Sequence, residues 1–185
     1  MKGLYTAAAI CMAVTITGCT SAETTTGSTD TATPPPVTTA VSTTPALPEV
    51  TFNPCDTIDD ALLVRFEVDP AERDRHEFSL GREDILACNI LGEHRTINIV
   101  AQNTPWDDIP FRVAPQAITV NGRQAWYVPG GTSEDSCSVL MRTDFGAVIV
   151  EHTVRRGGTT DPNMDRCDRI MELAEAVEPL IDNEN

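Results

Sequence analysis

The fold class follows from Ile118-Thr119-Val120-Asn121-Gly122-Arg123-Gln124-Ala125-Trp126-Tyr127-Val128, a stretch in the second half of the 185-residue chain. Its two ends are rich in β-branched and aromatic residues, which favour strands. Asn121-Gly122 between them readily adopts the positive φ angles that a tight hairpin requires. Trp126 and Tyr127 are neighbours on the second strand, so their side chains are expected on opposite faces of a sheet. The stretch therefore predicts an antiparallel hairpin.

Apolar runs on both sides of this hairpin extend the predicted sheet. Turns at 92–94 and at Asp144-Phe145-Gly146 join the strands in pairs, which makes the sheet mainly antiparallel. The charged segment 72–77 is expected to be a loop. The four additional strands are predicted at residues 85–91, 96–101, 137–143 and 147–154.

One helix is expected before the sheet and one after it. The first begins at a cap on Asp56 or Thr57, because Thr57 with Asp60 resembles a capping box, and it ends at Asp69-Pro70. The last helix begins at the cap Asp161-Pro162 and carries one apolar stripe. That stripe consists of Cys167, Ile170, Met171, Ala174 and Val177. We therefore predict an α+β fold, with N- and C-terminal helices packed on one face of a mainly antiparallel sheet.

The beginning of the chain has the pattern of a lipoprotein signal peptide. Lys2 precedes an apolar run that ends in Ile16-Thr17-Gly18-Cys19, a lipobox. Residues 1–18 are then removed, and Cys19 receives diacylglycerol and further acyl chains such as palmitate. The apolar run is too short to span a bilayer, which takes roughly 20 apolar residues. The alternative is an ordinary cleaved signal that happens to contain a cysteine.

Residues 19–49 are expected to be a disordered tether and residues 50–183 a single extracytoplasmic domain. The tether is composed mostly of Thr, Ser, Ala and Pro, and such a composition cannot bury a core. As a coil it reaches on the order of 30 Å, which lifts the domain off the membrane. These features predict attachment to the extracytoplasmic face of the cell membrane.

The charge balance makes nucleic acid a poor partner. The chain has 28 acidic and 13 basic residues and a formal net charge of −15. A protein this acidic is repelled by phosphate backbones. We therefore expect no binding to nucleic acid.

Four of the six cysteines are available to the folded domain. Cys11 lies in the signal peptide and Cys19 takes the lipid. The other four predict two disulfides, because an exported protein is in an oxidising compartment. Their spacing leaves three pairings open. Zinc binding is the alternative, but there is no Cys-x-x-Cys pair to support it. The four are Cys55, Cys88, Cys137 and Cys167.

Two cysteine-bearing motifs resemble a known family. The chain contains Asn53-Pro54-Cys55-Asp56, then Val68-Asp69-Pro70, and later Cys167-Asp168-Arg169. In these motifs it resembles the actinobacterial lipoproteins of mycobacterial or nocardial type, which contain an Asn-Pro-Cys domain of unknown function. The resemblance covers about residues 52–181. It implies an exported, lipid-anchored, disulfide-bonded α+β domain. It also favours pairing Cys55 with Cys88 and Cys137 with Cys167, and it implies no activity.

No motif for catalysis, a cofactor or a metal is evident. Asp161, Asn163, Asp165 and Glu172 fit a calcium loop in part, but Arg166 stands where the loop needs glycine. Ser133 and Ser136 lie in a polar turn and not in a nucleophile elbow, and His152 is expected to be a half-exposed strand residue and not a base. Trp106 is expected to cover the core from a loop. We therefore expect a protein without enzymatic activity, cofactor or metal ion.

The leading functional expectation is a binding or interaction module. Its partners would be the membrane, through the lipid anchor, and either an envelope protein or a small-molecule ligand. The alternative is a structural or assembly factor of the cell envelope, and an envelope hydrolase is a distant third. An apolar cavity would favour the binding module, whereas a broad exposed apolar face would favour the assembly factor.

Overall fold

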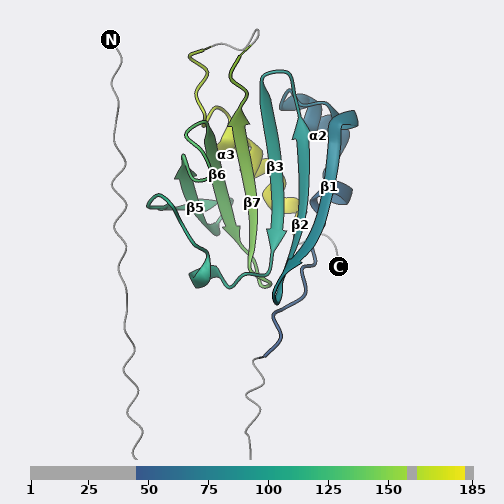
Figure 1. Ribbon diagram of the computed structural model, residues 1–185, viewed down its shortest axis with the longest axis vertical. Helices are drawn as coiled ribbons and strands as arrows, with labels where there is room; N and C mark the ends of the chain where they lie inside the picture. The colour runs from purple at the N-terminus through teal and green to yellow at the C-terminus, as the bar shows by residue number, and fades with distance from the viewer. Residues whose placement is uncertain (1–44, 158–161, 182–185) are drawn as a thin grey trace, which may run out of the picture. The chain divides into compact units, whose positions relative to one another are not determined.

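The computed structural model describes residues 45–157 and 162–181, which form an α+β domain (Figure 1). Its seven strands make one antiparallel sheet in the order β1-β2-β3-β7-β6-β5-β4. The predicted signal peptide, the lipobox with Cys19 and most of the tether lie outside the described residues. The strands are β1 (Arg73–Leu80), β2 (Glu83–Leu91), β3 (Arg95–Gln102), β4 (Gln116–Val120), β5 (Arg123–Pro129), β6 (Ser136–Arg142) and β7 (Ala147–Val154).

The hairpin predicted around Asn121-Gly122 is confirmed. β4 and β5 pair from Gln116 opposite Tyr127 to Val120 opposite Arg123. Asn121 has a φ of 49° and Gly122 a φ of 93°, the positive values that a two-residue turn requires. The other four predicted strands are also present, as β2, β3, β6 and β7.

The prediction of a loop at 72–77 was wrong. Arg73–Leu80 forms β1, which pairs with β2 along its whole length. β1 is an edge strand, and most of its side chains are exposed. Charged residues are frequent on edge strands because they discourage pairing with other chains. The charge pattern alone therefore resembled that of a loop.

The single N-terminal helix expected from the sequence is two short helices, α1 (Pro54–Thr57) and α2 (Asp60–Arg65). The caps are Asn53, whose side chain accepts a hydrogen bond from the Cys55 amide, and Asp59, which accepts one from the Leu62 amide. The caps predicted at Asp56 and Thr57 were therefore wrong. A 3₁₀ turn, η1 (Pro70–Glu72), leads into β1.

The C-terminal helix begins later than predicted. α3 spans Ile170–Val177 and continues into the 3₁₀ turn η3 (Glu178–Leu180). Asp161 lies outside the described residues, and Pro162 is not helical. Arg169, with a φ of 58°, precedes α3 in the left-handed region, and the Asp165 carboxylate accepts a hydrogen bond from the Cys167 amide in the preceding turn. No helix in 45–157 or 162–181 has the length and apolar character needed to cross a membrane.

Two disulfides join the terminal segments to the sheet. Cys55–Cys88 links α1 to β2, and Cys137–Cys167 links β6 to the turn before α3, each with a Cα–Cα distance of 5.1 Å. The presence of two disulfides agrees with the cysteine count. Their pairing is sequential, and each bond fastens a segment with little regular structure to a buried strand.

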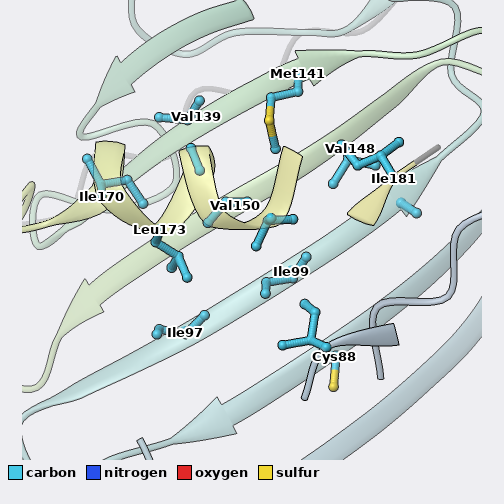
Figure 2. Close-up of a cluster of buried hydrophobic side chains, with 14 of the residues drawn as sticks. Cys88, Ile97, Ile99, Val139, Met141, Val148, Val150, Ile170, Leu173 and Ile181 are labelled. Carbon is cyan, nitrogen blue, oxygen red and sulfur yellow. The ribbon is translucent and has the colours of Figure 1, made fainter. Parts of the chain in front are cut away.

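The main core lies between the sheet and α3. Strand alternation places Ile99, Val139 and Val150 on one face, which we call the helix face. Figure 2 shows α3 lying over these strands, with Ile170 and Leu173 among the labelled core side chains. Both are 2% exposed. The opposite side of the sheet, which we call the open face, is turned toward the viewer in Figure 1 and has α3 behind it.

Candidate functional site

A smaller apolar cluster covers part of the open face. Trp126 and Leu140 lie opposite each other on β5 and β6 and belong to this face. The connection between β3 and β4, which contains the 3₁₀ turn η2 (Trp106–Asp108), packs against them. Trp106 stacks on Trp126 with ring centroids 4.0 Å apart and is only 5% exposed, so the prediction that it covers the core is confirmed.

Trp126 and Tyr127 are on opposite faces, as their adjacent positions predict. Tyr127 packs against the main core on the helix face, whereas Trp126 lies in the cluster on the open face. The Phe111 ring meets Trp126 edge-on, with centroids 4.7 Å apart. The aromatic contacts therefore hold the β3–β4 connection onto the sheet.

A groove of about 470 Å³ lies beside this connection, over β5, β6 and β7. We call it the open-face groove. Its size is within the range of about 300 to 1,000 Å³ that is common for small-molecule sites. Both its walls and its floor are largely apolar. The apolar lining residues are Ile109, Pro110, Phe111, Val128, Leu140 and Ile149.

Polar side chains of Thr132, Ser138 and Glu151 gather within the groove lining. Oε2 of Glu151 accepts hydrogen bonds from the Ser138 hydroxyl at 2.9 Å and the Thr132 hydroxyl at 2.7 Å. Ser138 and Glu151 are directly opposite each other on β6 and β7, so the strand register creates this contact. Oε1 of Glu151 makes no hydrogen bond among residues 45–157 and 162–181. The groove therefore holds an oriented carboxylate with one oxygen free for a ligand.

The turn before β6 supports this polar group. Ser136 is fully buried, and its hydroxyl oxygen accepts hydrogen bonds from the amides of Thr132 and Ser133. Arg112 donates to the carbonyl oxygen of Thr132 at 3.2 Å and joins the turn to the β3–β4 connection. The prediction of a turn is confirmed for Ser133, whereas Ser136 is the first residue of β6.

Sequence reasoning did not identify Glu151 as a site residue. The available signal was a break in the apolar pattern, because Ser138 comes directly before the apolar run 139–141 and Glu151 directly after the apolar run 147–150. Only the pairing of β6 with β7 brings these two residues together.

The expectation of a half-exposed His152 was wrong. His152 is 2% exposed and lies on the helix face, opposite Cys137 of β6. Neither of its ring nitrogens makes a hydrogen bond within the described residues. Burial, and then the positive charge of Arg95, lower the pKa of His152 to about 4. Because Glu151 and His152 are adjacent on β7, they face opposite sides of the sheet and do not form one site.

A polar hollow of about 520 Å³ at the turn between β6 and β7 is a weaker candidate. Its two guanidinium groups already have partners. Arg123 forms an ion pair with Glu178 at 2.9 Å, and Arg142 donates to the side-chain oxygen of Gln124 at 3.0 Å. A ligand would have to displace these contacts, whereas the open-face groove has apolar walls and a carboxylate oxygen without a partner.

Among known proteins, the chain matches one family model. A family model described as a protein of unknown function (DUF3558) matches residues 14–180, which include every described strand and helix. No curated protein and no solved structure matches the chain.

Proposed function

The chain belongs to the DUF3558 family of proteins of unknown function, and from that premise we propose that it is a lipid-anchored binding protein of the actinobacterial cell membrane. The lipobox at residues 16–19 and the Thr/Pro-rich tether support an anchor on Cys19 and an extracytoplasmic position. Two disulfides fit an oxidising compartment. We propose binding, and no reaction, as the function of this protein.

The open-face groove is the observation that carries this proposal. We propose that it binds a small molecule with an apolar body, since six apolar side chains line it. We propose also that the N-terminal helices cover the same face as α3. Phe52, Leu63 and Phe66 share one buried cluster with Ile170 and Leu173, which supports this arrangement. The open face would then be left for the ligand.

Shortening Phe111 tests the groove as a binding site. Phe111→Ala removes one apolar wall, and burial of a side chain of this size contributes about 1.5 to 3 kcal/mol, so the affinity for n-octanol is expected to fall roughly tenfold or more. Isothermal titration calorimetry on the full-length protein measures this affinity. Val64→Ala is the control, because Val64 is 62% exposed on α2 and does not line the groove. Absence of octanol binding, or equal binding by Phe111→Ala, would contradict the proposal.

Replacing the lipidated cysteine tests the anchor. Cys19→Ala is expected to move the protein from the membrane fraction to the soluble fraction, because the acyl chains supply the membrane affinity. Cell fractionation followed by immunoblotting measures the change. Cys11→Ala, which alters the cysteine within the signal peptide, should leave the protein on the membrane. Firm membrane attachment of the Cys19→Ala protein would be the contrary result.

A second candidate function is an assembly factor of the cell envelope. The observation that favours it is the exposure of Phe78 and Leu80, at 48% and 60%, on the edge strand β1. Both are on the open face but outside the groove lining. The octanol titration separates the candidates, since an assembly factor needs no ligand in the groove.

A further inference from the structure

We infer that the ligand of the open-face groove is an amphipathic molecule with a protonated amine, which pairs with the Glu151 carboxylate. This inference rests on the proposed function and specifies the chemical class of its ligand. It requires that the groove accept an apolar body and that Glu151 be available to the polar head.

The hydrogen bonds of Glu151 favour a donor as its partner. Two hydroxyl groups, those of Thr132 and Ser138, converge on Oε2 and hold the carboxylate in one orientation. Oε1 has no partner in the described parts of the chain. A carboxylate oxygen can only accept hydrogen bonds, and its bonds with cationic donors are stronger than those with neutral donors. An ammonium group satisfies both conditions.

The partial burial of Glu151 strengthens this preference. Its side chain is neither fully exposed nor fully buried, and it stands beside the apolar side chains of Leu140 and Ile149 in the groove. Charges in such a position are screened less by salt than charges on an open surface. The carboxylate would lose hydration when an apolar ligand body fills the groove, and a cation on that ligand compensates for the loss.

The charges around the groove also disfavour an anionic ligand. Arg112 is the one basic side chain in the groove lining, and it is exposed and already bonded to the Thr132 carbonyl oxygen. Glu151 would repel an anion bound beside it. The formal net charge of −15 for the whole chain acts in the same direction, because it raises the local concentration of cations.

Three eight-carbon probes with the same apolar tail test the inference. Calorimetric titrations at pH 7 would compare the binding of n-octylammonium, n-octanol and n-octanoate to the full-length wild-type protein. We expect octylammonium to bind about tenfold more tightly than octanol, because the ammonium adds a charge-assisted hydrogen bond. Octanoate is expected to bind more weakly than octanol. The preference for octylammonium should decrease as the salt concentration rises.

Glu151→Gln is the decisive variant, because it removes the charge and keeps the shape of the side chain. The tenfold preference for octylammonium over octanol is expected to be lost in this variant. Glu72→Gln is the matched control, because Glu72 is exposed and does not line the groove. This variant should keep the preference for octylammonium.

The outcomes separate the inference from the proposed function. If octanol binds and octylammonium binds no more tightly, the amine inference is overturned and the groove remains a ligand site. If the preference survives in Glu151→Gln, the ammonium is bound elsewhere and the inference is also overturned. If none of the three probes binds, the proposed function fails together with the inference.

Discussion

Removal of the Cys55–Cys88 disulfide, by Cys55→Ala and Cys88→Ala together, is expected to lower the free energy of unfolding by about 3 to 4 kcal/mol. The bond closes a loop with a sequence separation of 33 residues, so its loss increases the conformational entropy of the unfolded chain. Both half-cystines are also buried, at 4% and 1% exposure, and their removal leaves unfilled space in the core.

Urea denaturation at neutral pH, followed by circular dichroism, measures this change. Val64→Ala is a suitable control, because it removes an exposed apolar side chain and should alter stability by less than about 0.5 kcal/mol. A loss below about 1 kcal/mol in the double variant would contradict the prediction. α1 would then be held on the sheet by packing alone.

His152 is expected to make the protein less stable as the pH falls from neutral to 4. The His152 pKa is about 4 in the folded protein, below its ordinary value of 6.5. The unfolded protein therefore binds a proton at a higher pH than the folded protein does. The stability that neutral His152 contributes is fully present above pH 6.5. It decreases as the pH falls from 6.5 to about 4, and it is lost near pH 4. The difference between these two pKa values corresponds to about 3 kcal/mol in the free energy of unfolding.

His152→Leu isolates this contribution. Leucine is similar in size and cannot be protonated, and it removes two ring nitrogens that lack hydrogen bonds. We expect the variant to be at least as stable as the wild type at pH 7 and to lose less stability between pH 7 and pH 4. Urea midpoints across that range measure the difference, with His76→Gln as an exposed control. An unchanged pH dependence in His152→Leu would show that other groups cause the acid sensitivity.

Local sequence rules predicted most of the sheet correctly. Asn121-Gly122 lies between two strand-forming runs, and a two-residue turn directly determines which residues pair across a hairpin. The same rules failed for Arg73–Leu80, because an edge strand is hydrogen-bonded on one side only and tolerates charged residues. Only its pairing with β2 distinguishes this segment from a loop.

The ends of the helices depended on contacts that sequence patterns do not contain. The segment before α3 has acidic residues and a proline that are typical of a helix start, yet α3 begins only at Ile170. Cys167 is bonded to Cys137 of β6, and Arg169 adopts a left-handed conformation before the helix starts. The disulfide and the packing of α3 on the sheet thus outweighed a local capping signal.

The sequence by itself determined the class of the protein: the antiparallel hairpins, the two disulfides expected from four cysteines, and membership of a family of unknown function. These features follow from short-range turn geometry and from the number and position of particular residues. Tertiary structure alone decided the open-face groove, its Glu151 carboxylate and the burial of His152. The physical reason is that strand pairing and the packing of distant segments bring together side chains such as Phe111, Ser138 and Glu151, and no local pattern specifies those contacts.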